Sequence, residues 1–588
     1  MESIDLEFNN LSLTVNIWEP LVTKTLRPDK KTILKNVSGS FYRNQVTAIL
    51  GCSGSGKSTL MNILSGYTSS GYQGSVTLNG ARRDLLSFRN VSSYIMQEDH
   101  LQLYLTVQES MEIAMKLKHS TIKLDMKKRT TINSLLDNLL LCDKRDSLVY
   151  TLSGGERRRL TIALELVRSP QVMFFDEPTT GLDIVSANKV IKIMRKLADS
   201  GKTIICTIHQ ASAYHLTTFD TVYVLTPFGQ CMYNGKSSQI VNYFSDLGFQ
   251  CPIYHNPADY VIELSLGEYE NSIDTLVNLV EEQNQNDQHI PNQSGQSDDN
   301  EPVVYNREYS TKYFPELWIL MHRSLLTTLR DHFLVNVRLF VHFVLGTMFG
   351  IVYMGLGKSA MHVRDNAVLL FFCVMFMTYV ASFTMSLKFP LELSVMRKEY
   401  FNRWYSLSSY YISITLVDLP VQIFCTFLFC SLIYLLSGQP IIFFRISMFL
   451  LIFIVTGLMS QAIGMLVSTL CKSFVINTVI VALILMFWTT YSGGMIRISD
   501  TPEIYRWLYD ISFMKHSVQG VLHAVYGFDR SVLPCSNIFC PYGSPKVMLK
   551  TIDMADNLYW INVSFITSIY FVLKISSFIA LKYKLSTT

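Results

Sequence analysis

The chain of 588 residues is 49% hydrophobic and only 16% charged, with a net charge of +4. Soluble proteins have about a quarter of their residues charged, and so small a net charge does not favour nucleic-acid binding. The shortage of charge is confined to the second half, so the composition excludes a wholly soluble protein. Near the start, Asp5 and Glu7 interrupt any apolar run. We therefore expect no signal peptide and a cytosolic first half.

A phosphate-binding loop is the first motif along the chain. The apolar run Val46 to Leu50 predicts a buried strand, and it is followed by Gly51-Cys-Ser-Gly-Ser-Gly-Lys57-Ser58. Glycines let backbone N–H groups cradle phosphates, while the lysine neutralises the outer phosphates and the serine holds Mg²⁺. The predicted ATP-binding residues are Gly51, Cys52, Ser53, Gly54, Ser55, Gly56, Lys57, Ser58 and Thr59. Alone, such a loop would also fit kinases, GTPases and helicases.

A second phosphate-binding surface is predicted at Leu152-Ser-Gly-Gly-Glu156. The following run, Arg157 to Leu166, lacks Gly and Pro and predicts a helix with Ser153 as its N-cap. Unpaired N–H groups and the positive end of the helix dipole favour a phosphate there. One nucleotide rarely needs two helix N-termini from one subunit, so this loop points to a second chain.

Two adjacent carboxylates follow the next apolar run. Val172 to Phe175 predicts a parallel strand, and Asp176 and Glu177 come directly after it. The carboxyl edge of such a sheet is where ligands bind, so Asp176 suits the Mg²⁺ side of the site. Glu177 can accept a proton from the attacking water, or orient it. A lone acidic pair would more often be a solvated loop, but the other motifs favour catalysis.

In this order the motifs resemble those of the ATP-binding cassette (ABC) family, where the signature loop of one subunit closes on the ATP held by another. The resemblance implies an α/β P-loop NTPase cassette that acts as a dimer, with ATP and Mg²⁺ as cofactors. It assigns catalysis to Glu177, His209 and Gln97, Mg²⁺ binding to Ser58, Gln97 and Asp176, and further ATP contacts to Ser153, Gly154, Gly155, Glu156 and Asp183. Ile17 and Trp18 are both candidates for stacking on adenine.

The predicted domain order is a cassette at 1–265, a disordered polar linker at 266–310, an amphipathic connecting helix at 311–330 and a membrane domain at 331–588. The linker is rich in Gln, Asn, Asp and Ser between Glu281 and Asn300. The connecting helix alternates aromatic and aliphatic residues with Arg323 and Arg330.

Six apolar stretches in the second half have the ~20 residues that a membrane span needs. They are Val335 to Met354, Ala367 to Phe389, Leu416 to Leu436, Ile446 to Leu470, Phe474 to Met495 and Tyr559 to Leu581. Basic residues between spans two and three, between spans four and five and in the tail predict that these segments and both termini are cytosolic. The segment 497–558 is then extracellular.

Three features of the predicted loops bear on function. Val395 to Trp404 is charged and tethered to two spans, so we expect it to contact the cassette; the alternative is a basic loop held by lipid headgroups. Cys535 and Cys540 are the two extracellular cysteines, and their spacing predicts a disulfide. The alternative is a zinc site, but two cysteines without a neighbouring His do not provide the tetrahedral ligand set of zinc. Asn562 lies in a glycosylation sequon close to the membrane.

A cassette placed before one six-span domain resembles the G subfamily of ABC half-transporters, also called the White type, with a G-type exporter fold. Asn256-Pro-Ala-Asp-Tyr260 matches its motif. The segments that look most like the sterol- and lipid-exporting branch are Tyr405 to Tyr411, Ser492-Gly493, Ile511 to Phe513 and Tyr526 to Arg530. The chain departs from the subfamily at Cys52, where proline is usual, and at Gly494-Met495, where two bulky residues usually plug the outer end of the pathway.

By the same resemblance, the substrate cavity lies on the dimer axis between spans two and five. It would be lined by Phe372, Met375, Phe376, Tyr379, Met486 and Thr489; a packing or lipid-facing surface is the alternative. We expect no acidic or basic residue to interrupt either span, which favours an apolar or amphipathic cargo such as sterol or another lipid. A transporter of pigment precursors or small metabolites and a non-transporting regulator are the other hypotheses. The partner is a second half-transporter, identical or related, and the plasma membrane is the expected location.

Overall fold

The computed structural model describes residues 4–17, 29–119, 125–209, 211–267, 272–288, 313–471, 473–535, 540, 542–555 and 558–586. The chain divides into two compact units. Unit 1 comprises Met1–Ile319 and Arg397–Ser406, and unit 2 comprises Leu320–Met396 and Leu407–Thr587. The segment Arg397–Ser406 therefore belongs to unit 1, although it is flanked on both sides by unit 2.

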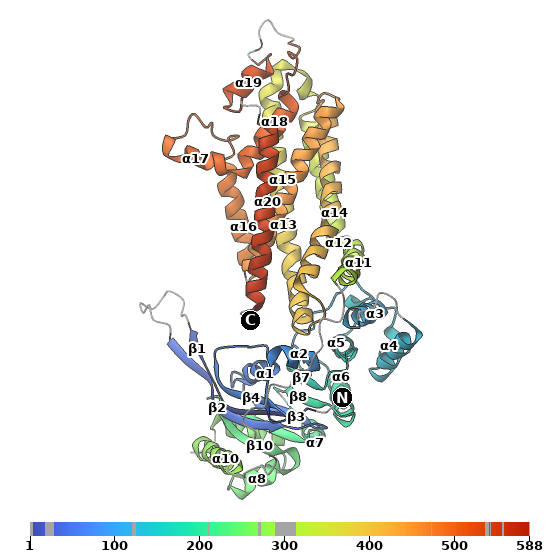
Figure 1. Cartoon of the computed structure of the whole chain (residues 1–588), viewed down its shortest axis with the longest axis vertical. Coiled ribbons are helices and arrows are strands. Elements are labelled where there is room, and N and C mark those ends of the chain that lie inside the picture. Colours follow the sequence, from blue (N-terminus) through green and yellow to red (C-terminus); the bar gives the residue numbers. More distant parts are fainter. Residues whose placement is uncertain are drawn as a thin grey trace. The chain divides into compact units, whose positions relative to one another are not determined.

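A mainly parallel sheet forms the centre of unit 1 (Figure 1). Among the described residues it has six strands in the order β10-β9-β3-β8-β7-β6. Their bounds are β3 Val46–Gly51, β6 Ser92–Ile95, β7 Val172–Phe175, β8 Thr203–Thr207, β9 Thr221–Leu225 and β10 Cys231–Lys236. Every residue of β3, β7 and β8 is buried, as expected for apolar strands covered on both faces. Of the pairings between these described strands, only β9–β10 is antiparallel.

A second, antiparallel sheet packs against the first. Within the described ranges its order is β2-β1-β4-β5, with β1 Leu6–Ile17, β2 Asp29–Phe41, β4 Tyr72–Leu78 and β5 Ala81–Arg82. Phe8 and Phe41 from this sheet meet Tyr223 of β9, with ring centroids 5.2 to 5.9 Å apart. These buried rings join the two sheets into one hydrophobic core.

Helices cover the two sheets of unit 1. They are α1 Lys57–Ser65, α2 Leu85–Val91, α3 Val107–Lys118, α4 Met126–Asn138, α5 Gly154–Leu166, α6 Ile184–Asp199, α7 Ala213–Thr218, α8 Ile240–Asp246, α9 Pro257–Leu266 and α10 Ser272–Gln288. Helix α10 contradicts the prediction of a disordered linker over its own span. Its polar composition hides an apolar face, and Leu276, Val277 and Val280 are buried. The rest of the predicted linker, 289–310, lies outside the described residues.

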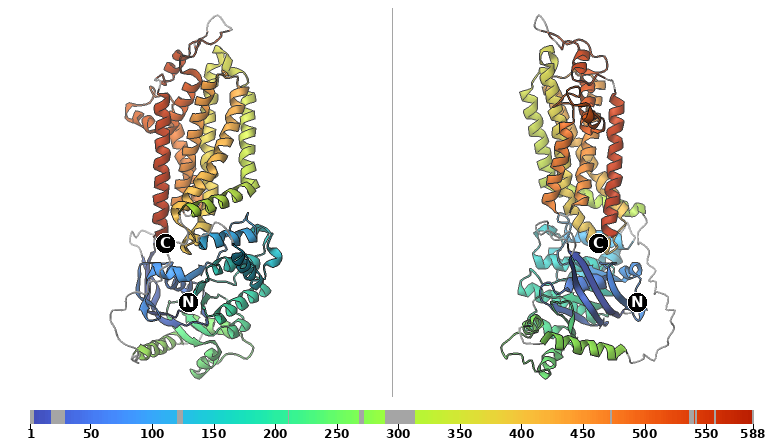
Figure 2. Two further views of the ribbon diagram at one scale, coloured as in Figure 1. Left: turned by 45° about the vertical axis from the view of Figure 1, so that its right-hand side comes forward. Right: turned by 90° about the vertical axis from the view of Figure 1, so that its left-hand side faces the viewer.

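Unit 2 is a helical bundle (Figure 2). Its main helices are α12 His332–Val352, α13 Val363–Phe401, α14 Leu407–Leu436, α15 Phe443–Leu470, α16 Phe474–Thr490 and α20 Tyr559–Ser586, preceded by α11 Tyr313–Arg330. Among the described residues, five helices are long and apolar enough to cross a membrane, while α16 has only 17 residues. Small residues permit close packing: a Cβ on Gly464 of α15 would lie 2.3 Å from the Ser382 carbonyl oxygen of α13.

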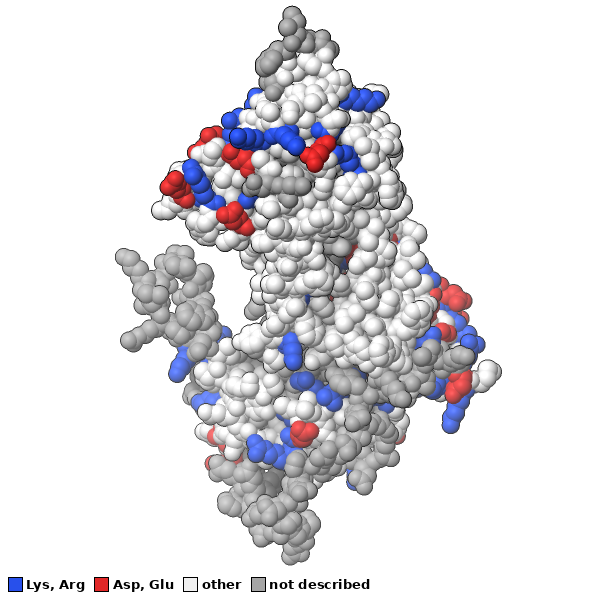
Figure 3. Space-filling view, turned by 45° about the horizontal axis from the view of Figure 1, so that its top comes forward, with Lys and Arg blue, Asp and Glu red and all other residues white. Residues whose placement is uncertain are grey.

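The segment 497–558 contains α17 Glu503–Ile511, α18 Phe513–Tyr526 and α19 Pro545–Thr551. Twelve residues of α18 are buried, and this helix packs against α15 and α20. The segment is thus more than an outer loop, because one of its helices belongs to the core of the bundle. Figure 3 shows charged side chains gathered at the end of unit 2 that contains this segment, whereas the sides of the helical bundle below it carry almost none.

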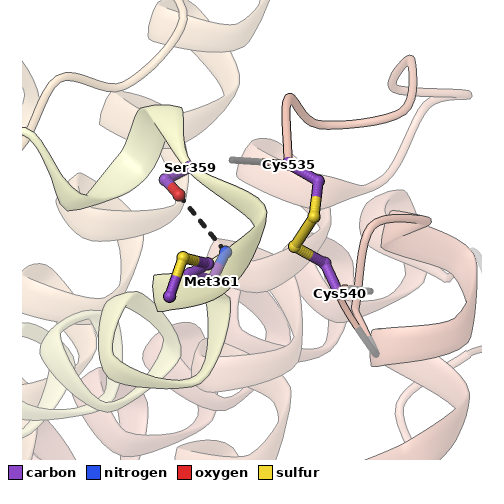
Figure 4. Close-up of a disulfide and its surroundings, with 4 residues drawn as sticks. All are labelled: Ser359, Met361, Cys535 and Cys540. Carbon is purple, nitrogen blue, oxygen red and sulfur yellow. Dashed lines mark hydrogen bonds between the residues drawn. A yellow bond between two sulfur atoms is a disulfide. The ribbon is translucent and has the colours of Figure 1, made fainter. Parts of the chain in front are cut away.

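Two predicted features of this end can be located in the structure. Cys535 and Cys540 form a disulfide beside the turn held by the Ser359–Met361 hydrogen bond (Figure 4). Asn562 is fully buried in α20, where its amide oxygen contacts His516 at 2.7 Å. An acceptor with no exposed surface cannot take a glycan, so Asn562 is not a glycosylation site in this fold.

Candidate nucleotide-hydrolysis site

The phosphate-binding loop lies between β3 and α1. Gly56 has φ 92°, and a Cβ there would lie 2.9 Å from the Leu34 side chain, so the turn requires glycine. A Cβ on Gly54 would meet nothing within 4 Å, so this side of the loop is open. No side chain of the described residues caps the N-terminus of α1. The first turn of α1 therefore presents its N–H groups as a phosphate site requires.

Two buried polar groups of the loop, the Lys57 ammonium and the Ser55 hydroxyl, can bind an anion. The Lys57 ammonium donates to the carbonyl oxygens of Gly51 and Cys52, at 2.7 and 2.8 Å. Burial lowers the pKa of Lys57, whereas the nearby Glu177 carboxylate acts to raise it. The Ser55 hydroxyl is buried with no hydrogen-bond partner among the described residues. Phosphate oxygens would satisfy both groups.

Asp176 is held by hydroxyl groups from two other elements. Its Oδ1 accepts from Ser58 of α1 at 3.1 Å and from Thr207 of β8 at 2.7 Å. Two of the three side chains predicted to bind Mg²⁺, Ser58 and Asp176, are thus in contact, and hydroxyl and carboxylate oxygens are ligands that Mg²⁺ prefers. The residues present fit the cation.

Glu177 lies beside Gln97. The Gln97 amide donates to Glu177 Oε2 at 2.9 Å, and the Thr180 hydroxyl donates to the same oxygen at 3.0 Å. The Glu177 backbone has φ 45°, a left-handed conformation that is uncommon outside glycine and concentrates at functional sites. Its N–H donates to the Thr207 hydroxyl at 2.8 Å. Thr207 therefore joins the two acidic residues, a role that the sequence did not reveal.

The signature loop begins α5 with its own side chain as a cap. Ser153 Oγ accepts from the Glu156 N–H at 3.3 Å, and Glu156 Oε2 accepts from the Ser153 N–H at 2.9 Å. The N-cap role predicted for Ser153 is thus present, and Glu156 of the same chain completes the capping box. Asp183 caps the neighbouring helix α6 by accepting from Ser186 N–H at 2.9 Å. His209 is exposed, two residues beyond β8.

Arg158 of α5 is a second residue that the sequence did not single out. Its guanidinium is almost fully buried and donates to the carbonyl oxygens of Met96 and Gln97, at 2.6 and 2.5 Å. It also pairs with Asp99 at 3.2 Å. The helix that follows the signature loop is therefore tied to the segment around Gln97. A buried guanidinium needs hydrogen-bond acceptors. Because residues 157 to 159 are all arginine, the sequence does not indicate which of the three is buried against such acceptors.

The segment Arg397–Ser406 packs inside unit 1, as predicted for Val395 to Trp404. The Asn402 side chain accepts from the Tyr94 N–H and donates to the Tyr94 carbonyl oxygen, both at 3.1 Å. The Trp404 indole donates to Glu165 Oε1 at 3.2 Å. Each bond joins a side chain of the segment to the cassette.

An ion pair lies under the Trp404 ring. Lys118 donates to Glu165 Oε2 at 2.8 Å, and both side chains are at most 2% exposed. The ammonium also lies 4.2 Å from the centroid of the Trp404 ring, a cation–π contact. Burial lowers the pKa of Lys118 to about 8, although Glu165 acts in the opposite direction.

The residues predicted to line a substrate cavity do not share one environment. Phe372 of α13 and Met486 of α16 are 38% and 66% exposed, and Met375 and Tyr379 are partly buried. Phe376 packs on Phe429 and His342, and Thr489 is bonded to its own helix. Phe376 and Thr489 therefore belong to the interior of the bundle. Gly494 contacts Phe371 so closely that a Cβ would lie 2.4 Å from its ring.

A charged cluster inside unit 2 is a further feature that the sequence reading missed. Asp418 of α14 is buried and its carboxylate lies 3.4 Å from both Arg338 of α12 and Lys388 of α13. Gln461 of α15 donates to the same carboxylate at 2.7 Å. Arg338, Lys388 and Asp418 lie within predicted spans one, two and three. The expectation of a charge-free span is therefore wrong for span two, which contains Lys388, and it holds for span five.

The fold and the site define a nucleotide-hydrolysing cassette joined to a helical membrane domain. Family models agree: the ABC transporter model matches residues 34–180, and the ABC-2 type transporter model matches residues 315–526. The chain is 26% identical to ABC transporter ATP-binding protein/permease wht-1 of Caenorhabditis elegans, over 94% of this chain and 87% of the relative. It is 27% identical to Protein white of Ceratitis capitata (90% and 80%) and 29% identical to ABC transporter G family member 7 of Arabidopsis thaliana (83% and 70%).

This chain belongs to the ABC transporters and has the domain order and relatives of the G subfamily of half-transporters. It is a membrane protein that binds ATP and couples ATP hydrolysis to transport.

Proposed function

We propose that this chain forms a dimer that exports a sterol or another lipid. The observation that carries this cargo is the apolar surface of α13 and α16, where Phe372 and Met486 remain exposed in the single chain. No acidic or basic residue interrupts the sequence from Ala367 to Leu387 or from Phe474 to Thr490. A charged cargo would need a compensating charge on this surface, whereas a lipid needs none.

The charged cluster at Asp418 does not oppose this cargo. Asp418 is 4% exposed and its carboxylate is bonded from three other helices, so its charge is compensated within the bundle. A buried carboxylate that already has cationic and amide partners offers little to a passing substrate. We keep Phe372, Met375, Tyr379 and Met486 as the lining of the cavity and withdraw Phe376 and Thr489, because both point into the bundle.

For hydrolysis, Ser58, Asp176 and Gln97 would hold Mg²⁺, and Lys57 with the loop from Gly51 to Thr59 would bind the phosphates. Bound Mg²⁺ supplies a positive charge that stabilises the reacting phosphate oxygens. Glu177 orients the attacking water and accepts its proton, and Gln97, which contacts Glu177, keeps that carboxylate in place. His209 contacts the terminal phosphate, and Ser153 to Glu156 and Asp183 of a second chain complete the site.

The Val395 to Trp404 segment transmits ATP-driven closure of the cassettes to the membrane helices. Its bonds to Tyr94 and Glu165 support this role, because they fix the segment to the strand before Gln97 and to the signature helix. We place the protein in the plasma membrane with both termini cytosolic. A same-subfamily transporter of pigment precursors or small metabolites is the second candidate, because it would share every motif of the ATP site.

ATPase and transport measurements on the purified chain in phosphatidylcholine liposomes test this proposal. We expect cholesterol or phospholipid to stimulate ATP hydrolysis, and Glu177→Gln to reduce turnover by about 10²-fold or more while ATP still binds. Movement of a hydrophilic dye without lipid stimulation would overturn the lipid cargo. Undiminished turnover of Glu177→Gln would remove Glu177 from the role of base.

A further inference from the structure

Tyr94 connects the Asp176 carboxylate to the segment Arg397–Ser406. This tyrosine lies in β6 and is 3% exposed. Its hydroxyl lies 3.1 Å from Asp176 Oδ2 and 2.8 Å from the Asn62 side-chain oxygen of α1. Within the described residues, the phenol is the only side chain of β6 that is hydrogen-bonded to either acidic residue of the site, and its proton is shared between the Asp176 and Asn62 oxygens.

The backbone of the same residue is held from the other direction. Strand β6 is at the edge of its sheet, so its outer N–H and C=O groups have no neighbouring strand. The Asn402 amide bonds to both groups of Tyr94 and so takes the place of a further strand. Phe401 packs against the Tyr94 ring at 6.0 Å, and Arg89 lies 4.6 Å from the centroid of the Phe401 ring.

We propose that Tyr94 is a positioning residue that orients Asp176 according to whether the Asn402 segment is docked. The carboxylate is fixed at Oδ1 by Ser58 and Thr207, and at Oδ2 by Tyr94. Removal of the third bond frees the carboxylate to rotate. Because one residue carries both contacts, a displacement of its backbone by Asn402 also moves its hydroxyl. The metal-binding consequence rests on the proposed role of Asp176 toward Mg²⁺.

The decisive variant is Tyr94→Phe, which keeps the ring and removes the hydroxyl. Tyr67→Phe is its matched control, because the Tyr67 ring packs on both Tyr94 and Phe401, at 5.7 and 5.1 Å, at the same place in the core. Asn402→Ala removes the contact on the segment side. All variants are made in the full-length chain, and thermal unfolding verifies that they fold.

Two measurements test the proposal. The first is the affinity of the ATP-bound protein for Mn²⁺, measured by electron paramagnetic resonance as a probe of the cation site. We expect Tyr94→Phe to weaken it about 10- to 100-fold, the effect of one lost hydrogen bond to a charged group, with metal-free ATP binding unchanged. The second is the ratio of ATPase rates in phosphatidylcholine liposomes with and without cholesterol. Tyr94→Phe and Asn402→Ala should lower it, and Tyr67→Phe should not.

Wild-type Mn²⁺ affinity in Tyr94→Phe would overturn the proposal, as would equal changes in Tyr94→Phe and Tyr67→Phe, which would indicate packing alone. Asp176→Asn separates this result from the underlying assignment. If that variant retains Mn²⁺ affinity, Asp176 is not a metal ligand and the proposed site fails, whatever Tyr94 does. If cholesterol stimulates none of the proteins, the cargo proposal fails, and the Mn²⁺ measurement still decides the role of Tyr94.

Discussion

At the scale of single residues, a substitution of Thr207 distinguishes the orientation of the Asp176 and Glu177 carboxylates from the binding of ATP. Its hydroxyl accepts from the Glu177 N–H and donates to Asp176. Thr207→Val keeps the shape of the side chain and breaks both bonds. We expect ATP hydrolysis to fall about 10- to 100-fold, the effect of a lost hydrogen bond to a charged group, with ATP affinity unchanged.

Thr203→Val is the matched control for this prediction. Thr203 lies on the same strand, is equally buried, and donates its hydroxyl to the Ile4 carbonyl oxygen instead of to the site. Turnover by the Thr207 variant equal to that of the Thr203 variant would contradict a role in orienting the carboxylates.

At the scale of elements, the Lys118–Glu165 pair joins α3 to α5 beneath Trp404. Lys118→Met removes the hydrogen bonds that the side-chain nitrogen donates to Glu165 and to the Leu164 carbonyl oxygen, and it should cost about 3–5 kcal/mol of the free energy of unfolding. Lys118→Met combined with Glu165→Leu should recover most of this loss, because the buried carboxylate that lost its donor is gone. Thermal unfolding of the detergent-solubilised chain measures both. Additive losses in the double variant would show that the two side chains do not act as a pair.

The pKa of Lys118 also gives this element a pH dependence. Burial lowers the pKa to about 8, so between about pH 8 and 10.5 the unfolded chain keeps a proton that the folded chain has released. Stability from this group therefore rises with pH in that window, by up to about 1.4 kcal/mol per pH unit. Lys118→Arg stays charged and lacks this rise. The stability difference between wild type and Lys118→Arg should grow above pH 8, and parallel pH profiles would refute the prediction.

At the scale of the whole molecule, two defective chains should rescue each other. Lys57→Met disables the phosphate loop and Ser153→Arg blocks the signature loop, so each homodimer should be inactive. In the proposed dimer, the mixed pair unites the intact phosphate loop of one chain with the intact signature loop of the other. A statistical mixture should reach about a quarter of wild-type ATPase activity, because half the dimers have one intact site of two. Two-tag purification isolates the mixed pair, and an inactive mixed pair would exclude a shared site.

Motifs that require a particular local backbone conformation could be predicted from the sequence. Contacts between side chains far apart in the chain could not. Gly56 at φ 92° and the cap at Ser153 follow local rules, so the phosphate loop and the start of α5 were predictable. Thr207, Arg158 and Tyr94 act through partners far away in the chain. Helix α10 was missed because its composition concealed three apolar residues, and the pairing of Asp418 required the packing of four helices.

The capping box at Ser153 has a consequence for the energy of closure. In the single chain, the Glu156 carboxylate already occupies the end of α5 that a phosphate of the partner's nucleotide would approach. Assembly of the proposed site then brings a second negative charge to a helix end that already has one. Repulsion between the carboxylate and the phosphate lowers the free energy gained on closure. A dimer that closes with only a small gain in free energy can open again after each ATP is hydrolysed.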